Sequence, residues 1–242
     1  MPARADTIQA QEKAWNEIGR AGTWWTGVER VAIAAETRHA VSCPLCAARR
    51  QALSPSMVGG DHASLRMLPA AAVEAIHRIR TDSGRIGEAW YRGLLAAGMD
   101  QERYVELISV VVITVAIDTF QFAAGLDPLP LPAAHPGEPA RRRPVGAKRE
   151  LTWVATLAPE DVGPNDPDLY HIRPGVLKRS GANIQRALSL VPHSMIHWWD
   201  MFETMYQPGP WMRDFSREYR AVSHAQMEML AARVSALNRC EY

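Results

Sequence analysis

The sequence has few cysteines, almost no net charge and no long uninterrupted apolar run. Three cysteines in 242 residues are too few for a disulfide framework, and an odd number fits a reducing compartment. A formal net charge of +1 gives no field that favours nucleic acid or an acidic membrane surface. The longest apolar run, residues 108–117, is shorter than the about 20 residues that span a bilayer. We therefore expect a cytoplasmic protein that binds neither nucleic acid nor membranes.

Apolar residues recur at helical spacing along most of the sequence, and this pattern predicts an all-α fold. Thr26 and Glu29 form a capping-box pattern, which predicts the start of a helix over 26–40. Pro44 suits the first position of the next helix, because its missing N–H is not needed there. Further helices are predicted over 6–20, 69–81, 86–97, 100–124, 182–190, 193–206 and 216–239.

Proline and arginine interrupt this pattern near the middle of the chain. Six prolines lie between Pro128 and Pro144, together with three consecutive arginines at 141–143. Such a segment cannot continue a helix or a central strand, so it is a linker or an extended strap. The sequence thus predicts an N-terminal helical half over 1–127, a Pro/Arg-rich linker over 128–175 and a C-terminal helical half over 176–242.

A helix start followed by a cysteine occurs twice. Thr26 precedes Cys43 by seventeen residues, and Ser223 precedes Cys240 by the same number. Both intervals run through small and apolar side chains, and the common offset between the two copies is 197 residues. This correspondence predicts two copies of one helix-to-cysteine unit.

Cys43 and Cys46 form a Cys-x-x-Cys pair at a predicted helix start. Unpaired N–H groups and the helix dipole stabilise a thiolate there. The two sulfurs fall within one turn, which suits a reversible disulfide, and attack on a peroxide would pass through a sulfenic acid. Two alternatives stay open. The pair is half of a zinc site, with His62 or His77 supplying further ligands, or it is a pair of buried structural cysteines.

Glu228 lies twelve positions before Cys240 and is a further candidate for proton transfer. Its neighbours Met227, Met229 and Leu230 would partly desolvate the carboxylate and raise its pKa toward a useful value. The alternative is that this side chain simply reaches solvent.

The C-terminal residues resemble the signature of the alkylhydroperoxidase D-like, carboxymuconolactone decarboxylase superfamily. That signature is a Glu, eleven residues, a Cys, two residues, a second Cys, three residues and a His. Glu228, Cys240 and Tyr242 match it, and the second Cys and the His would follow Tyr242. The tandem arrangement is similar to alkylhydroperoxidase-related selenoproteins, in which selenocysteine can replace the second cysteine. We therefore expect a selenocysteine position after Tyr242, which would make this chain a truncated and impaired form.

The first half resembles a divergent copy of the same motif, running from Glu29 through Cys43 and Cys46. Val31 stands at the position of the family's Glu, and Arg50 stands at the position of its His. This departure puts the proton relay of the first copy in doubt.

The resemblance implies two alkylhydroperoxidase D-like halves in a homo-oligomer that reduces hydroperoxides without a bound cofactor. A dithiol donor, such as a lipoyl or thioredoxin-type protein, would recharge the redox pair. Cys240 would be the resolving residue, Glu228 would move protons, and Cys43 and Cys46 would be a second redox pair or an electron relay. The alternatives are a redox-sensing or structural helical protein, and a carboxymuconolactone decarboxylase-like enzyme, against which the Cys43–Cys46 pair argues.

Overall fold

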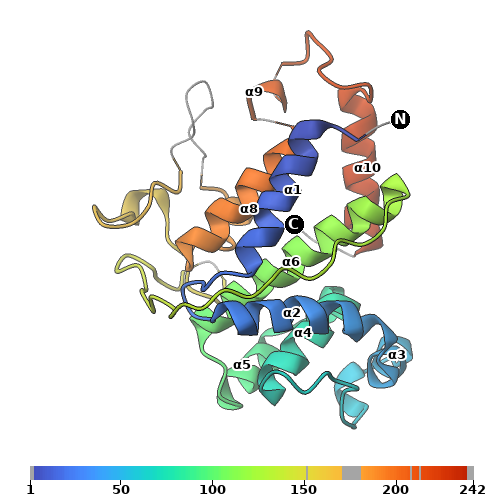
Figure 1. The fold of residues 1–242 in the computed structure, drawn as a ribbon, viewed down its shortest axis with the longest axis vertical. Coiled ribbons are helices and arrows are strands. Elements are labelled where there is room, and N and C mark those ends of the chain that lie inside the picture. Colours follow the sequence, from blue (N-terminus) through green and yellow to red (C-terminus); the bar gives the residue numbers. More distant parts are fainter. Residues whose placement is uncertain (1–2, 151, 171–180, 208, 213, 239–242) are drawn as a thin grey trace.

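The computed structural model describes residues 3–150, 152–170, 181–207, 209–212 and 214–238. Within these ranges the chain is helical and forms no strand, apart from one isolated antiparallel bridge between Lys148 and Thr156. The predicted all-α class is therefore confirmed. Figure 1 shows two groups of helices on either side of one long helix.

The long helix is α6, which runs from Gln101 to Ala124 and ends at Gly125. The φ of Gly125 is 69°, a left-handed conformation that favours glycine after a helix. On one side of α6 lie α2 (Gly27–His39), α3 (Pro44–Gln51), α4 (Ala70–Asp82) and α5 (Glu88–Ala96) (Figure 1). Helix α2 begins at the predicted capping box, where Thr26 N–H donates to Glu29 Oε2 at 2.9 Å.

The other group contains α1 (Ala5–Ile18) and α8 (Pro192–Met205), which contact each other and α6. Ile18, Leu107 and Met195, one from each of these three helices, belong to a single hydrophobic core. Side chains from both predicted halves therefore share one core. The division into two repeated halves remains a prediction about the sequence.

The C-terminal helices differ most from the sequence-based prediction. The helix expected over 182–190 is only a short turn, α7 (Asn183–Arg186), and α9 (Gly209–Met212) follows α8. The helix predicted to begin at Ser216 begins instead after Ser223, as α10 (His224–Leu237). Ser223 Oγ accepts from Gln226 N–H at 3.3 Å, so the second capping box fixes the true start.

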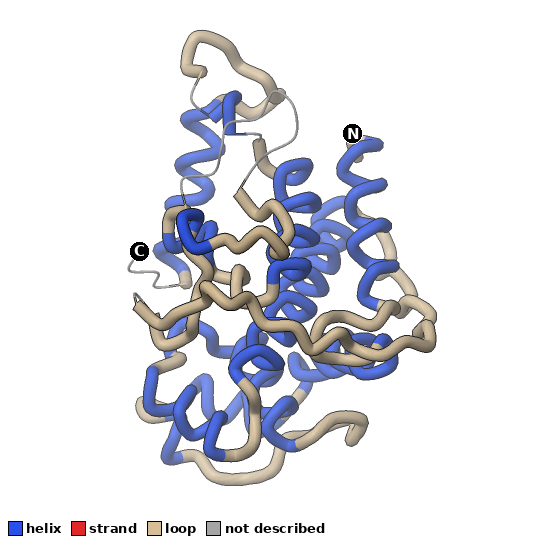
Figure 2. Tube along the Cα trace, turned by 90° about the vertical axis from the view of Figure 1, so that its left-hand side faces the viewer, coloured by secondary structure: helices blue, strands red, loops and turns tan. Residues whose placement is uncertain are grey.

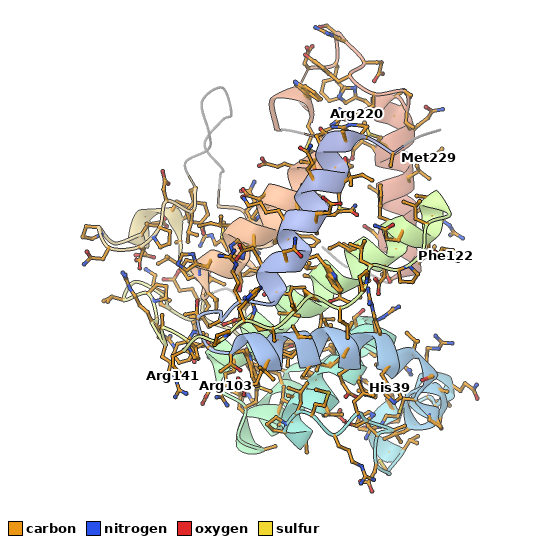
Figure 3. All side chains as sticks on the ribbon, viewed as in Figure 1. His39, Arg103, Phe122, Arg141, Arg220 and Met229 are labelled. Atoms are coloured by element: carbon orange, nitrogen blue, oxygen red, sulfur yellow. The ribbon has the colours of Figure 1, made fainter. Side chains whose placement is uncertain are left out.

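Helix α10 lies at the edge of the molecule (Figure 3). All of its residues after His224 are exposed or half-buried, and the Met229 side chain is 67% exposed. The apolar positions of this helix therefore contribute little to the core described above.

The proline-rich region forms an extended strap, here defined as residues 126–147, which Figure 2 shows as irregular loop. Trp15 Nε1–H donates to Pro130 O, and the backbone N–H of His135 donates to Gly19 O, both at 2.7 Å. A Cβ added to Gly19 would lie 2.2 Å from Ala133 O, so this close approach requires glycine. The strap is bound to the surface of the helices and is not a free linker.

A buried ion pair joins α2 to α6. Arg30 Nε lies 3.5 Å from Glu106 Oε1, and the two side chains are 5% and 0% exposed. Trp24 N–H donates to Glu106 Oε2 at 2.6 Å, while Arg30 Nη1 donates to the carbonyls of Glu17 and Arg20. Burial raises the pKa of Glu106, against the opposing effect of Arg30.

Within the described residues, α6 is the one helix that is long and apolar enough to cross a membrane by length and composition. It is longer than the apolar run seen in the sequence, because the helix continues through the polar positions on either side. Its contacts with α1, α2, α4 and α8 place it at the centre of the helical bundle.

Candidate metal centre

Two cysteines and two histidines meet beyond the end of α2, whose last residue, His39, is labelled in Figure 3. One ligand atom from each of Cys43, Cys46, His62 and His77 lies within 4.8 Å of all the others. His62 Nδ1 is 3.6 Å from Cys43 Sγ and 3.5 Å from Cys46 Sγ. His77 Nδ1 is 3.2 Å from Cys46 Sγ. We call these four residues the Cys2His2 cluster.

Local backbone structure places the two sulfurs side by side. After α2, a 3-10 turn over Ala40–Ser42 redirects the chain, and Cys43 then caps α3 with extended backbone angles. Pro44 occupies the first helical position, as predicted, and Cys46 follows within the first turn. The Cys-x-x-Cys spacing therefore turns both sulfurs toward the same point.

The first histidine comes from helix α4. His77 is fully buried, and its Nε2 lies 2.8 Å from Glu36 Oε1, a carboxylate on α2 that is also fully buried. A proton on Nε2 satisfies that contact and leaves Nδ1 free to face Cys46. Glu36 also accepts from Leu65 N–H at 3.0 Å, so it joins α2, α4 and the loop between α3 and α4.

The second histidine comes from that loop. His62 Nε2 lies 2.8 Å from Glu74 Oε2, so its Nδ1 again faces the sulfurs. Three groups position Glu74: His62, Arg49 Nη1 at 2.8 Å, and Trp90 Nε1–H, which donates to the other carboxylate oxygen at 2.8 Å. Each histidine of the cluster thus has one nitrogen toward the sulfurs and the other on a carboxylate.

The protonation of the cluster follows from these contacts. Burial opposes ionisation of Cys43, but N–H groups of Cys46 and Ala63 and the imidazole of His62 outweigh it and lower the thiol pKa to about 7. Burial likewise opposes protonation of His62, yet Cys46, Glu74 and Cys43 raise its pKa to about 10. The metal-free cluster therefore favours a thiolate beside an imidazolium.

The two remaining groups shift in different ways. Burial lowers the pKa of His77, which keeps its imidazole neutral despite the hydrogen bond to Glu36. Burial would raise the pKa of Glu74, but hydrogen bonds from His62, Trp90 and Arg49 lower it to about 2. Metal binding requires neutral imidazoles, so His77 is already in the binding state, whereas His62 must release its proton when a metal binds.

Three sulfur-to-nitrogen separations within the cluster are close to those of tetrahedral coordination. With Zn–S bonds of about 2.3 Å and Zn–N bonds of about 2.0–2.1 Å, neighbouring ligand atoms lie about 3.4–3.8 Å apart. Three of the four sulfur-to-nitrogen distances are 3.2, 3.5 and 3.6 Å, close to this range. A carboxylate on the far nitrogen of each histidine is also the usual second contact of metal-bound imidazole.

Of the residues proposed from the sequence, the structure brings Cys43 and Cys46 together with both histidines that the zinc alternative named. Cys240 lies outside the described residues. Glu228 is exposed, as the solvent-facing alternative expects, and accepts a hydrogen bond from Tyr206 Oη at 2.5 Å.

The sequence analysis missed the carboxylates Glu36 and Glu74 and the side chains of Arg49 and Trp90. No spacing along the chain indicated them, because Glu74 pairs with His62 and Glu36 pairs with His77, residues that come from different elements. Val31 and Arg50 suggested a defective relay in this half, yet the structure places two imidazoles beside the sulfurs and the carboxylate of Glu36 behind one of them.

No family model, no curated protein and no solved structure matches this chain. The chemistry of the Cys2His2 cluster is therefore argued from its own residues.

Proposed function

We propose that this protein binds one zinc ion through Cys43, Cys46, His62 and His77, and that the ion is structural. The observation that carries this proposal is the convergence of four ligand atoms within 4.8 Å, with the outer nitrogen of each imidazole 2.8 Å from a carboxylate oxygen. Two thiolates and two imidazoles are a preferred ligand set for zinc, and they leave no ligand position for a substrate.

The proposed ion would connect three parts of the chain. Cys43 and Cys46 belong to the start of α3, His77 belongs to α4, and His62 belongs to the loop between them. The second hydrophobic cluster of the molecule is small and contains only Cys43, Leu45 and Cys46, with Val58 packed against it. A bound metal would supply the stability that so small an apolar cluster does not.

Metal analysis of the purified protein tests this function. The expected result is one zinc per chain that survives gel filtration, and it would count against a catalytic peroxidase role for Cys43 and Cys46 in the zinc-bound protein. Cys46→Ser and His77→Ala should each lose the zinc, whereas His193→Ala, which changes an exposed histidine on α8, should retain it. Cobalt substituted for zinc should give the strong visible absorption of a tetrahedral sulfur-ligated site. Full zinc content in both ligand variants would disprove the assignment.

A second candidate is the thiol-dependent reduction of hydroperoxides that the family resemblance implies. The observation that favours it is the contact of Cys43 Sγ with His62 Nδ1 at 3.6 Å, which pairs a thiolate with an imidazolium when no metal is bound. Zinc would occupy both sulfurs, so this activity belongs to the metal-free protein. A dithiol such as dihydrolipoamide would return the disulfide to two thiols.

The two candidates give opposite responses to a chelator. Peroxide consumption that depends on dihydrolipoamide should increase after zinc removal if the pair is catalytic, and Cys43→Ser should abolish it. If the centre is only structural, chelation produces no turnover, and the protein loses stability instead.

A further inference from the structure

The loop between α3 and α4 covers the Cys2His2 cluster. We call residues 52–69 the lid. It contains one 3-10 turn, Pro55–Met57, and is otherwise irregular. Its contacts with the rest of the chain run largely through the cluster and its supporting residues. His62 is a cluster residue, Leu65 N–H donates to Glu36, and Val58 O accepts from Arg49 Nε at 3.1 Å.

The lid shields the sulfurs from solvent. Cys43 is 1% exposed and Cys46 is 5% exposed. Val58 packs against the small cluster of Cys43, Leu45 and Cys46, and the backbone N–H of Ala63 supports the thiolate of Cys43. A dissolved oxidant therefore reaches either sulfur only when the lid moves.

Hydrophobic burial holds the lid at few points: Leu68, next to α4, packs against the main core, and Val58 packs against the small cysteine-containing cluster. Leu53 is fully exposed, Met57 is 82% exposed and Met67 is 58% exposed. A segment with few buried apolar contacts opens at low free energy unless another interaction fixes it. At the centre of this lid, that interaction is the contact of His62 with the sulfurs and with Glu74.

We propose that the lid and the zinc ion form an oxidation-sensitive clasp: hydroperoxide converts Cys43 and Cys46 to a disulfide, which releases the zinc and opens the lid. This inference rests on the proposed zinc function, and it names the regulation of that site. The two sulfurs come from one helical turn and already lie within 4.8 Å, so no large backbone movement separates the reduced and oxidised pairs.

The reaction balances without any further reagent. One thiolate attacks the peroxide, the O–O bond breaks, and a sulfenic acid and an alkoxide form; the alkoxide takes a proton and leaves as the alcohol. The second thiolate then attacks the sulfenic sulfur, and the S–S bond forms as hydroxide leaves and is protonated to water. The two thiolates have lost two electrons, the peroxide has gained them, and zinc departs as the divalent ion.

Loss of both thiolate ligands removes the metal-mediated contact that holds the centre of the lid closed. His62 and His77 remain, but two neutral imidazoles alone bind zinc far more weakly than the complete set of four ligands. His62 then keeps its contacts with Glu74, Arg49 and the His77 ring but no longer shares a metal with the sulfurs. The Arg66 side chain is exposed, but hydrogen bonds from Leu65 N–H to Glu36 and from Arg66 N–H to Ser64 hold the backbone there, so opening would make the Arg66–Met67 bond a site for trypsin.

The experiment treats the zinc-loaded full chain with hydrogen peroxide and follows two signals together. A chromophoric chelator reports free zinc, and brief trypsin treatment with mass spectrometry reports cleavage after Arg66. We expect zinc release and cleavage to rise in parallel, with a Cys43–Cys46 disulfide in the cleaved fraction. Dithiothreitol plus zinc should restore protection. Chelation under reducing conditions should also permit cleavage after Arg66, without forming the disulfide.

Val58→Ala tests the shielding role, because it shortens the side chain that packs over the sulfurs without changing a metal ligand. It should keep the zinc content of the wild type and release zinc several-fold faster in peroxide. Val154→Ala, which trims a half-buried valine in the main core, is the matched control and should release zinc at the wild-type rate.

Several outcomes would overturn the clasp. A chain that binds no zinc from the start removes both this inference and the proposed function. Bound zinc that peroxide does not release, or release that leaves Arg66 protected, removes the clasp alone and leaves the structural zinc site intact. Equal release rates for Val58→Ala and the wild type would show that the lid does not control access.

Discussion

Arg49 and His62 converge on one oxygen atom: each has a side-chain nitrogen 2.8 Å from Glu74 Oε2. Arg49 also donates to Val58 O, so one guanidinium supports both a carboxylate behind the cluster and the segment above it. The orientation of His62 therefore depends on residues that would not touch a metal themselves.

Glu74→Gln should weaken zinc binding while leaving all four ligands present. An amide supports the imidazole less well than a carboxylate, and loss of such an outer contact costs about 10–100-fold in metal affinity. Competition with a chromophoric chelator measures the affinity. Glu88→Gln is the matched control, because Glu88 bonds only to surface arginines on the described part of the chain. Equal affinity in both variants would show that Glu74 does not position His62.

Zinc removal should lower the thermal stability of the protein reversibly. At a free zinc concentration 100 times the dissociation constant, binding adds about 2.7 kcal/mol to the free energy of unfolding. For a chain of this size, that corresponds to about 5–10 °C in the midpoint temperature. Calorimetry with and without chelator measures the shift. Magnesium, which prefers oxygen ligands, should not restore it. An unchanged midpoint would argue that the site contributes nothing to folding.

The thiol of Cys43 should ionise at unusually low pH in the metal-free protein. Its folded-state pKa of about 7 lies below the ordinary value of 9.0. A lowered pKa contributes stability that is fully present above the unfolded value and is lost as pH falls through about 7. Thiolate absorbance in the ultraviolet, followed in Cys46→Ser so that only one cluster thiol remains, measures the midpoint. A midpoint near the ordinary thiol value would show that His62 and the N–H groups do not act as described.

Glu106→Gln should be among the more damaging single substitutions in the bundle. It leaves the buried guanidinium of Arg30 without its counter-charge, which typically costs about 3–5 kcal/mol. Urea unfolding measures the change in free energy of unfolding. Glu12→Gln on the exposed face of α1 should stay within about 0.5 kcal/mol of the wild type.

Replacing both partners of that ion pair checks the cause. Arg30→Met with Glu106→Leu removes the unpaired charge, so the double variant should recover much of the lost stability. If the double variant is as unstable as the sum of its singles, packing at these positions matters more than charge.

The helices of the first half could be predicted from the sequence because their signals are local. The capping box at Thr26, Pro44 and Gly125 mark ends that the structure reproduces within one or two residues. The signal failed at Ser216, where helical periodicity extends backward past the cap that begins α10 at Ser223. The N-cap hydrogen bond of Ser223 sets the start of the helix, although the apolar periodicity continues on its N-terminal side.

Only part of the candidate site could be predicted from the sequence. The Cys-x-x-Cys pair is a local pattern, and His62 and His77 could be named as possible partners, but not chosen. Glu36 and His77 are separated by 41 positions in the chain, and only the packing of α2 against α4 brings them within 2.8 Å. Their relationship is a property of the fold, which no spacing rule along the chain reports.

Helix α2 is fastened at both of its ends by segments without regular secondary structure. At its start, a Cβ on Gly27 would lie 2.9 Å from His135 O of the strap, and at its far end Glu36 bonds to the backbone of the lid. Fraying from either end must therefore break contacts that belong to other parts of the sequence. The strap and the lid therefore stabilise the two ends of α2, and we expect local unfolding of this helix to begin with the loss of these loop contacts.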